Sequence, residues 1–167
     1  MTDNISFQND FTAACTLFVK AGEILHQHGF ANAKYWSKNH IEEEFSLSDE
    51  AEKHGFYVMY VNGIAAGAVI LETQTKDKDL WNDYKTANSL YISKMCIVPP
   101  FRGKKYSRTL FDFCIFKARE LSCDRIRFDT CADSRAHCAY YTKCGFEEIG
   151  QYQDTDERLC LFEMQVF

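Results

Sequence analysis

The chain has 167 residues, of which 46% are hydrophobic and 15% aromatic, and its formal net charge is −5. This apolar content suffices for one substantial core, so we expect a single domain over residues 1–167. The negative charge argues against nucleic acid or an anionic membrane as the main partner. No stretch has the ~20 apolar residues of a membrane span, and MTDNISFQND lacks the basic start and apolar core of a signal peptide. The sequence therefore predicts a cytoplasmic protein.

Eight cysteines are spread along the chain without a Cys-x-x-Cys pair or the Cys/His spacing of a zinc site. Most lie among apolar residues of predicted helices and strands, where a thiol behaves as a small hydrophobe. We expect reduced, buried side chains and no bound metal, with disulfides or zinc as the alternative. The cysteines are Cys15, Cys96, Cys114, Cys123, Cys131, Cys138, Cys144 and Cys160.

Two helices are predicted in the first part of the chain, because apolar residues recur there every three or four positions. The first runs from about Asp10, a good N-terminal cap, to Gly29, a good C-terminal cap. The second covers residues 31–45, and its Glu42–Glu44 run indicates a solvated face.

A β-hairpin follows a polar connector, Ser46–His54. Phe56–Val61 and Ile64–Leu71 are rich in β-favouring residues, and the Asn-Gly pair between them is a strong hairpin signal. Gly67 indicates a bulge, a close approach of another backbone, or a lack of room for a side chain. Glu72 ends the second strand, where it is either a candidate general base or a solvated carboxylate.

The next segment, Thr73–Ser89, is polar and charged and contains two isolated aromatic residues, Trp81 and Tyr84. Loops of this length without secondary structure tend to be functional or disordered in a compact domain. Trp81 either borders a functional site or anchors the loop to the core.

One buried strand, a basic turn and one helix are predicted from Leu90 to Leu121. Pro99-Pro100 ends the strand, and the helix places Leu110, Cys114, Ala118 and Leu121 on one face. The turn between them holds three cations at the start of the helix. Backbone N–H groups and the dipole favour an anion at such a place, which predicts a phosphate site; plain solvated surface is the alternative.

The last third of the chain contains three predicted strands and one helix. Asp124–Thr130 alternates charged and apolar residues and should pair in parallel with the Leu90 strand, because a helix connects the two. Asp133 or Ser134 caps a short helix that ends near residue 144. Glu147–Gln153 and Arg158–Val166 read as an antiparallel hairpin that completes a mixed sheet.

The basic turn resembles the acetyl-CoA loop of the Gcn5-related N-acetyltransferases (GNAT), Arg/Gln-x-x-Gly-x-Gly/Ala after a strand. Lys105 stands where the family usually has Gly, and Ser107 where it has Gly or Ala. The resemblance implies that the loop binds the cofactor's diphosphate and that the preceding strand bonds its pantetheine arm, entering where the two parallel strands splay apart. The implied cofactor residues are Met95, Cys96, Ile97, Val98, Arg102, Gly103, Lys104, Lys105, Tyr106 and Ser107.

A second match is Tyr140–Phe146, YYTKCGF, which resembles the family's Phe-Tyr-x-x-x-Gly-Phe signature. By this resemblance the phenol of Tyr141 lies near the CoA sulfur and protonates the departing thiolate. The alternative is that Tyr141 packs beneath the sheet. Ser134 stands where the family often has an Asn that contacts the cofactor.

The resemblance implies an α/β fold with a central mixed, mostly antiparallel sheet, a splayed parallel strand pair and about four flanking helices. It also implies an acetyl-CoA-dependent N-acetyltransferase, in which a primary amine of a small molecule or peptide attacks the thioester directly and no metal takes part. Glu72 is the candidate base, and Trp36, Trp81 and Tyr84 are candidate substrate contacts. The family's first two helices flank the acceptor groove, so Trp36 or Glu44 could touch substrate; core packing and solvent exposure are the favoured alternatives for these two residues. The alternative is a catalytically inactive acyl-CoA-binding or regulatory module. A homodimer is one possible assembly.

Overall fold

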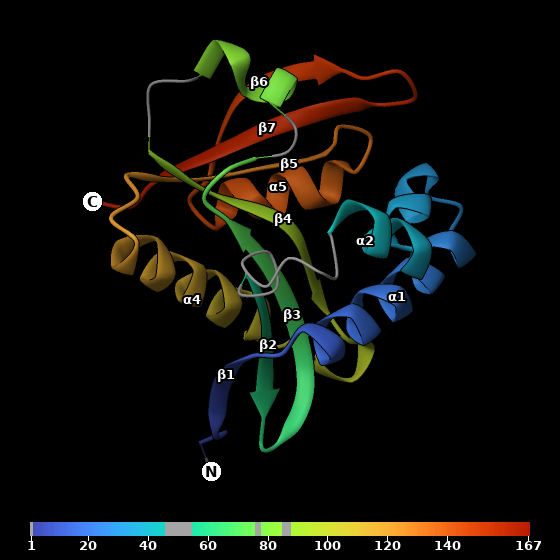
Figure 1. The fold of residues 1–167 in the computed structure, drawn as a ribbon, viewed down its shortest axis with the longest axis vertical. Helices are drawn as coiled ribbons and strands as arrows, with labels where there is room; N and C mark the ends of the chain where they lie inside the picture. The colour runs from blue at the N-terminus through green and yellow to red at the C-terminus, as the bar shows by residue number, and fades with distance from the viewer. Residues whose placement is uncertain (1, 46–54, 76–77, 85–87) are drawn as a thin grey trace. The chain divides into compact units, whose positions relative to one another are not determined.

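The structure is a computed structural model that describes residues 2–45, 55–75, 78–84 and 88–167; the predicted connector over residues 46–54 lies outside them. Within these ranges the chain forms seven strands, four α-helices and three 3₁₀ helices (Figure 1). They are β1 (Ile5–Asn9), α1 (Phe11–Gln27), η1 (Ala31–Trp36), α2 (Lys38–Glu44), β2 (Phe56–Val61), β3 (Ile64–Glu72), η2 (Lys78–Tyr84), β4 (Ser89–Ile97), η3 (Pro99–Phe101), α4 (Tyr106–Glu120), β5 (Arg125–Cys131), α5 (Arg135–Lys143), β6 (Glu147–Gln153) and β7 (Arg158–Gln165).

The strands form one sheet in the order β1-β2-β3-β4-β5-β7-β6. Strands β4 and β5 pair in parallel, with Ser89–Tyr91 opposite Arg125–Arg127. The pairs β1·β2, β2·β3, β5·β7 and β6·β7 are antiparallel. The predicted mixed, mostly antiparallel α/β sheet is therefore confirmed, including the parallel pairing across the connecting helix.

The chain divides into two units. The first comprises Met1–Leu71 and Lys94–Phe111, and the second comprises Glu72–Ser93 and Asp112–Phe167. Strand β4 passes from the second unit into the first, and helix α4 passes from the first into the second.

Helix α1 confirms the prediction for residues 10–29. The Asp10 carboxylate accepts a hydrogen bond from the Ala13 N–H at 2.9 Å and so caps the first turn. Gly29 lies just past the helix with φ +75°, a conformation that glycine adopts without strain. Phe18 of this helix is fully buried and packs against Phe56 of β2, with ring centroids 6.4 Å apart. The core of the first unit forms around this contact.

The prediction of one helix over residues 31–45 is wrong. The segment forms the short η1, breaks at Ser37 and continues as α2. Ser37 has an extended backbone, with φ −70° and ψ 154°, and its hydroxyl accepts a hydrogen bond from the His40 N–H at 3.2 Å. A serine in this position starts a new helix more readily than it continues an old one.

The predicted hairpin is confirmed, with Asn62 and Gly63 at φ +51° and +81° in the turn. Gly67 of β3 marks a close approach of another backbone: an added Cβ would lie 2.7 Å from the Cys96 carbonyl oxygen. Strand β1 pairs along β2 from Ile5 opposite Val61. The sequence did not predict this strand, because its five residues are mostly polar and none of them is fully buried.

The predicted strand, turn and helix from Leu90 to Leu121 are β4, η3 and α4. Leu110, Cys114 and Ala118 of α4 are fully buried, as expected. Leu121 is an exception, since it lies beyond the helix end and is 47% exposed. None of the described helices is both long and apolar enough to cross a membrane.

In the second unit, the segment predicted to be a loop contains the helix η2, so its description as structureless is wrong for Lys78–Tyr84. Helix α5 follows Ser134, but the Ser134 side chain makes no capping bond. Gly145, with φ +99°, comes just after this helix. The C-terminal hairpin β6·β7 is confirmed, and Leu159 and Leu161 of β7 are buried.

Candidate functional site

The residues predicted to form the site divide between the two units. The first unit holds Trp36, Met95, Cys96, Ile97, Val98, Arg102, Gly103, Lys104, Lys105, Tyr106 and Ser107. The second unit holds Glu72, Trp81, Tyr84, Ser134 and Tyr141.

In the first unit, the end of β4 is fixed by two hydrogen bonds. The Val98 N–H donates to the Ala66 carbonyl of β3 at 2.9 Å. The Arg102 Nε donates to the Ile97 carbonyl at 2.8 Å, which folds the guanidinium back onto the strand end. The Val98 N–H is therefore already engaged within the sheet, so a cofactor contact at Val98 would need another of its atoms.

The basic loop leads directly into α4. Gly103, Lys104 and Lys105 are exposed, and Gly103 has φ +71° with open space around it. The Lys105 carbonyl accepts from the Thr109 N–H at 3.1 Å, so the helical hydrogen bonds start at Lys105. The N–H groups of the first turn precede this ladder and lie beside two lysines, an arrangement that suits a phosphate group. These residues fit the diphosphate of acetyl-CoA.

Tyr106, the first residue of α4, is hydrogen-bonded to a residue near the start of the chain. Its hydroxyl donates to the Asp3 carboxylate at 2.6 Å, and the Asn62 side-chain amide donates to the same carboxylate at 2.9 Å. These bonds lower the pKa of Asp3, and the bond to Asp3 raises the pKa of the Tyr106 phenol. The Tyr106 side chain thus helps to fix where α4 begins.

A pocket of about 470 Å³ lies in the first unit, between α1, the start of β3, the end of β4 and η3. Four residues predicted to bind the cofactor line it: Cys96, Ile97, Val98 and Arg102. Burial raises the pKa of the Cys96 thiol to about 12, so this thiol is neutral near pH 7 and unsuited to act as a nucleophile.

The sequence prediction missed Lys94, a charged residue within the apolar β4. Lys94 is 7% exposed, and its ammonium lies 3.2 Å from the Glu44 carboxylate of α2. It also lies 5.7 Å from the centroid of the Trp36 ring. Trp36 thus packs between the core and this ion pair. The signal for Lys94 was its charge in an otherwise buried strand.

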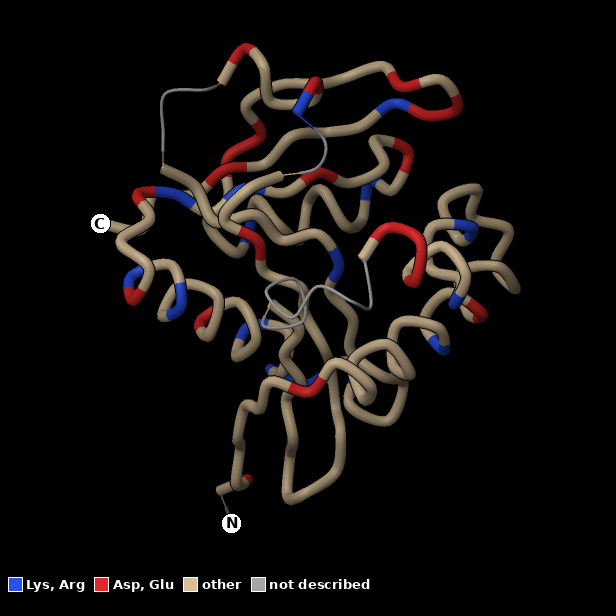
Figure 2. The backbone as a smooth tube through the Cα atoms, in the orientation of Figure 1, with Lys and Arg blue, Asp and Glu red and all other residues tan. Residues whose placement is uncertain are grey.

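Glu44 was expected on a solvated face, together with the rest of the acidic turn of α2 (Figure 2). Glu42 and Glu43 are exposed as predicted, whereas Glu44 is partly buried. Its carboxylate also lies 3.1 Å from His40 Nε2. The expectation is therefore wrong for Glu44, because its position on the helix turns it toward Lys94.

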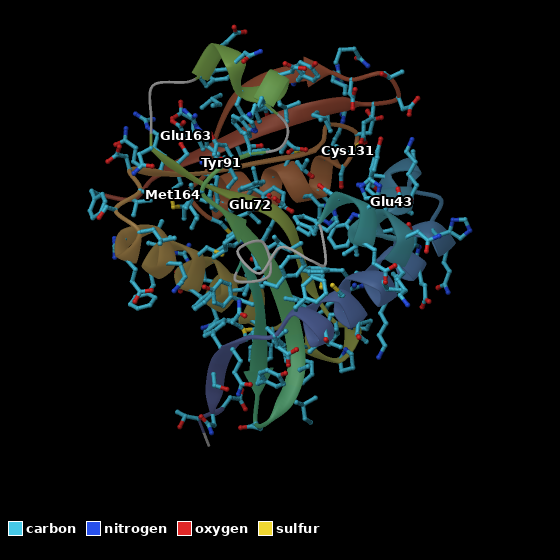
Figure 3. All side chains as sticks on the ribbon, in the orientation of Figure 1. Glu43, Glu72, Tyr91, Cys131, Glu163 and Met164 are labelled. Carbon is cyan, nitrogen blue, oxygen red and sulfur yellow. The ribbon has the colours of Figure 1, made fainter. Side chains whose placement is uncertain are left out.

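In the second unit, Glu72 lies at the end of β3 and is labelled in Figure 3. Its carboxylate accepts a hydrogen bond from the Ser93 hydroxyl of β4. Sequence reasoning did not identify Ser93. The bond fixes one carboxylate oxygen, which gives Glu72 a defined orientation at the strand end.

Trp81 and Tyr84 of η2 lie together, with ring centroids 6.4 Å apart. Trp81 is 4% exposed and packs against Tyr91 of β4, and the Arg127 guanidinium lies 5.5 Å from its ring centroid. The Tyr84 hydroxyl donates to the Ile149 carbonyl of β6 at 3.2 Å. Trp81 therefore anchors η2 to the core of the second unit, and its role as a substrate contact stays a prediction.

Arg127 is a buried cation that the sequence prediction did not single out. It is 3% exposed, and its Nε donates to the Glu163 carboxylate at 2.7 Å. Arg125 pairs with the same carboxylate. Glu163 and Tyr91 are labelled in Figure 3. The two arginines and Glu163 join β5 to β7 beneath Trp81.

Tyr141 of α5 is partly buried among aromatic rings of the second unit. Its ring centroid lies 4.8 Å from that of Phe128 and 5.6 Å from that of Phe162. Burial is the main cause that raises the pKa of its phenol to about 12. The phenol is therefore protonated throughout the physiological pH range. Ser134 shares a hydrogen bond with His137 Nδ1 at 2.6 Å, one turn before Tyr141.

Comparison with protein families gives a match to the acetyltransferase (GNAT) family over residues 22–146. Comparison with curated protein sequences gives no match. Among solved structures, a GNAT-family acetyltransferase from Listeria monocytogenes is similar, with 19% identity and a TM-score of 0.75, over 98% of this chain and 94% of that chain.

Two further structures have more specific descriptions. The ribosomal-protein-S18-alanine N-acetyltransferase from Escherichia coli is 16% identical, with a TM-score of 0.63, over 99% of this chain and 94% of that chain. A Bacillus anthracis protein described as a streptothricin acetyltransferase was solved in complex with acetyl coenzyme A. It is 21% identical, with a TM-score of 0.53, over 66% of this chain and 61% of that chain. At these identities the likeness concerns the fold.

Proposed function

The chain belongs to the acetyltransferase (GNAT) family, and from this premise we propose that it transfers an acetyl group from acetyl-CoA to a primary amine of a small molecule or peptide. The observation that carries the proposal is the basic loop that opens α4 directly after β4. It offers a helix N-terminus, two exposed lysines and Arg102 to one anion. The proposed site of the reaction is the cytoplasm, whose reducing conditions suit eight free cysteines.

Acetyl-CoA supplies the activated acetyl thioester. In the proposed reaction the amine attacks it directly, and no covalent intermediate with the protein forms. An ammonium has no lone pair, so the amine must lose a proton before or during the attack. Glu72 is the proposed acceptor of this proton, and its bond with Ser93 supports the assignment because it holds the carboxylate in one orientation.

Tyr141 is the proposed general acid. Its pKa of about 12 means that the phenol always carries the proton that a departing thiolate needs. The aromatic contacts with Phe128 and Phe162 restrict the orientation of the ring.

The alternative function is an inactive acyl-CoA-binding or regulatory module with a degraded loop. The departures at Lys105 and Ser107 motivated it, since glycine allows conformations that other residues avoid. Among the described residues, neither one has positive φ, whereas Gly103 does. The backbone conformation of the loop therefore needs no glycine at residue 105 or 107, which supports the enzymatic proposal.

The test is calorimetric titration with acetyl-CoA, followed by a screen of amines for release of the CoA thiol. We expect saturable binding that weakens at least tenfold in the Arg102→Ala, Lys104→Ala double variant, because two charge-assisted contacts with the diphosphate are lost. Binding without thiol release for any amine class would favour the inactive module. If the wild-type chain binds no acetyl-CoA at millimolar concentration, the proposal is wrong.

A further inference from the structure

The pocket of the first unit has one wall that no motif of the sequence indicated, helix α1. Leu17, Lys20, Ala21 and Ile24 of α1 all line it. Their spacing of three, one and three residues places them on one face of the helix. The opposite wall is the end of β4 with Pro99 and Pro100, so α1 and the proposed cofactor strand face each other across the same space.

The two walls of the pocket combine apolar side chains with positively charged ones. The α1 side chains Leu17, Ala21 and Ile24 and the two prolines are apolar, whereas Lys20 and Arg102 contribute positive charge. Such a lining suits a largely apolar chain that ends in an anion. The pantetheine arm of acetyl-CoA offers methylene and methyl groups to such a lining, carries two amides that the end of β4 can bond, and is joined to the diphosphate.

We propose that α1 forms a wall of the cofactor groove and that Lys20 binds the diphosphate together with Arg102. The inference rests on the proposed function, because it identifies a further binding residue for the same cofactor. The Arg102 Nε is held by the Ile97 carbonyl. A guanidinium has five N–H groups, so this bond uses only one of the donors. Lys20 is exposed and supplies an ammonium from the α1 side of the pocket.

One lining residue opposes an anion. Glu23 lies three residues after Lys20 on α1 and carries a carboxylate at the same pocket. It repels a diphosphate, while two cations attract it, so the net charge of the lining favours the anion. The proposal therefore predicts opposite effects for neutralising Lys20 and for neutralising Glu23.

The experiment measures dissociation constants of CoA, dephospho-CoA and pantetheine for the full chain by calorimetry. Dephospho-CoA keeps the diphosphate and lacks only the 3′-phosphate, and pantetheine has no phosphate. Lys20→Ala should weaken CoA and dephospho-CoA equally, by about tenfold, because one charge-assisted contact is lost. It should leave pantetheine binding unchanged. Lys34→Ala, which removes a lysine of η1 that does not line this pocket, is the matched control and should bind all three as the wild type does.

Two further variants test the groove itself. Glu23→Gln should tighten CoA binding about twofold, because a screened repulsion is removed. Ala21→Leu narrows the pocket without changing its charge and should weaken both CoA and pantetheine. The inference is overturned if Lys20→Ala matches Lys34→Ala, if its loss disappears with dephospho-CoA, or if it changes only the Michaelis constant for the amine. A wild-type chain that fails to bind CoA would instead overturn the proposed function.

Discussion

Burial of the Tyr141 phenol beside Phe128 and Phe162 sets its protonation over the whole working range of pH. With a pKa of about 12, this group stays protonated until strongly alkaline pH. A basic limb in the pH profile of kcat below about pH 10 must therefore come from another group, since the pKa of this phenol, about 12, lies well above its ordinary value of ~10.

Replacement of this residue gives the first prediction. Tyr141→Phe should lower kcat about 100-fold, because a general acid typically contributes at least this factor. The shape of the pH profile between pH 6 and 10 and the dissociation constant of acetyl-CoA should stay unchanged. Steady-state kinetics between pH 6 and 10 measures kcat and its pH profile, and Tyr140→Phe is the control variant. Full activity of the Tyr141→Phe variant would assign the proton to water.

Glu72 gives a second prediction at the same scale. Glu72→Gln should reduce kcat about 100-fold at neutral pH, because the amide cannot accept the proton of the amine. Ser93→Ala should cost less, since Ser93 only orients the carboxylate. Kinetics with a saturating amine separates the two variants. Equal and small losses for both would mean that the proton leaves by another route.

At the scale of elements, Gly67 determines how closely β3 approaches the end of β4 in the first unit. A Cβ at this position would meet both the Cys96 carbonyl oxygen and the Ile97 Cδ1 at 2.7 Å. The carbonyl belongs to the backbone, so it can only move if the strand end moves with it. The strand end carries Ile97 and Val98, which gives Gly67 an influence on the proposed cofactor site.

The corresponding prediction concerns Gly67→Ala. The variant should lose about 1–3 kcal/mol of unfolding free energy, because overpacking of a filled core has this cost. Its affinity for acetyl-CoA should fall as well. Urea unfolding and calorimetry measure the two effects. Ile64→Thr, on the same strand but 61% exposed, should change stability by less than about 0.5 kcal/mol. A Gly67→Ala midpoint equal to that of the wild type would show that β4 adapts freely.

At the scale of the whole molecule, buried thiols make stability depend on alkaline pH. Burial raises the pKa of Cys15 to about 11 and those of Cys96 and Cys160 to about 12, and it also raises the pKa of Cys114. In the unfolded chain these thiols ionise near their ordinary value of 9.0. Because the folded pKa is the higher one, the neutral thiol stabilises the fold fully below pH 9 and less as the pH rises toward 12.

Unfolding by urea should therefore show a constant midpoint from pH 7 to 8.5 and a steady decline from pH 9 to 12. Between its unfolded and its folded pKa, each such thiol lowers the free energy of unfolding by about 1.4 kcal/mol per pH unit. Replacing Cys96 with Ala should reduce the slope although it also lowers stability at pH 7. A midpoint that is flat to pH 11 would contradict the burial of these thiols.

Local chemistry explains which features the sequence predicts well. The Asn62-Gly63 turn, the Asp10 cap and the change from β4 to a basic loop and then to α4 depend on residues that are neighbours in the chain. The family motifs have the same local character. From them the sequence by itself determined the mixed α/β class, the antiparallel hairpins and the parallel pairing of β4 with β5.

Tertiary structure alone decided which charged side chains are buried and what they contact. Lys94 with Glu44, Arg127 with Glu163 and Trp81 with Arg127 are pairs of residues that lie far apart in the chain. Two other features also depend on residues far apart in the chain. The Val98 N–H donates a hydrogen bond to the Ala66 carbonyl, and α1 lines the pocket at the end of β4. A pattern of residue types specifies the face of a strand or helix but not the partner across from it. The partner is selected by packing and by the need to pair each buried polar group, and both require the folded chain.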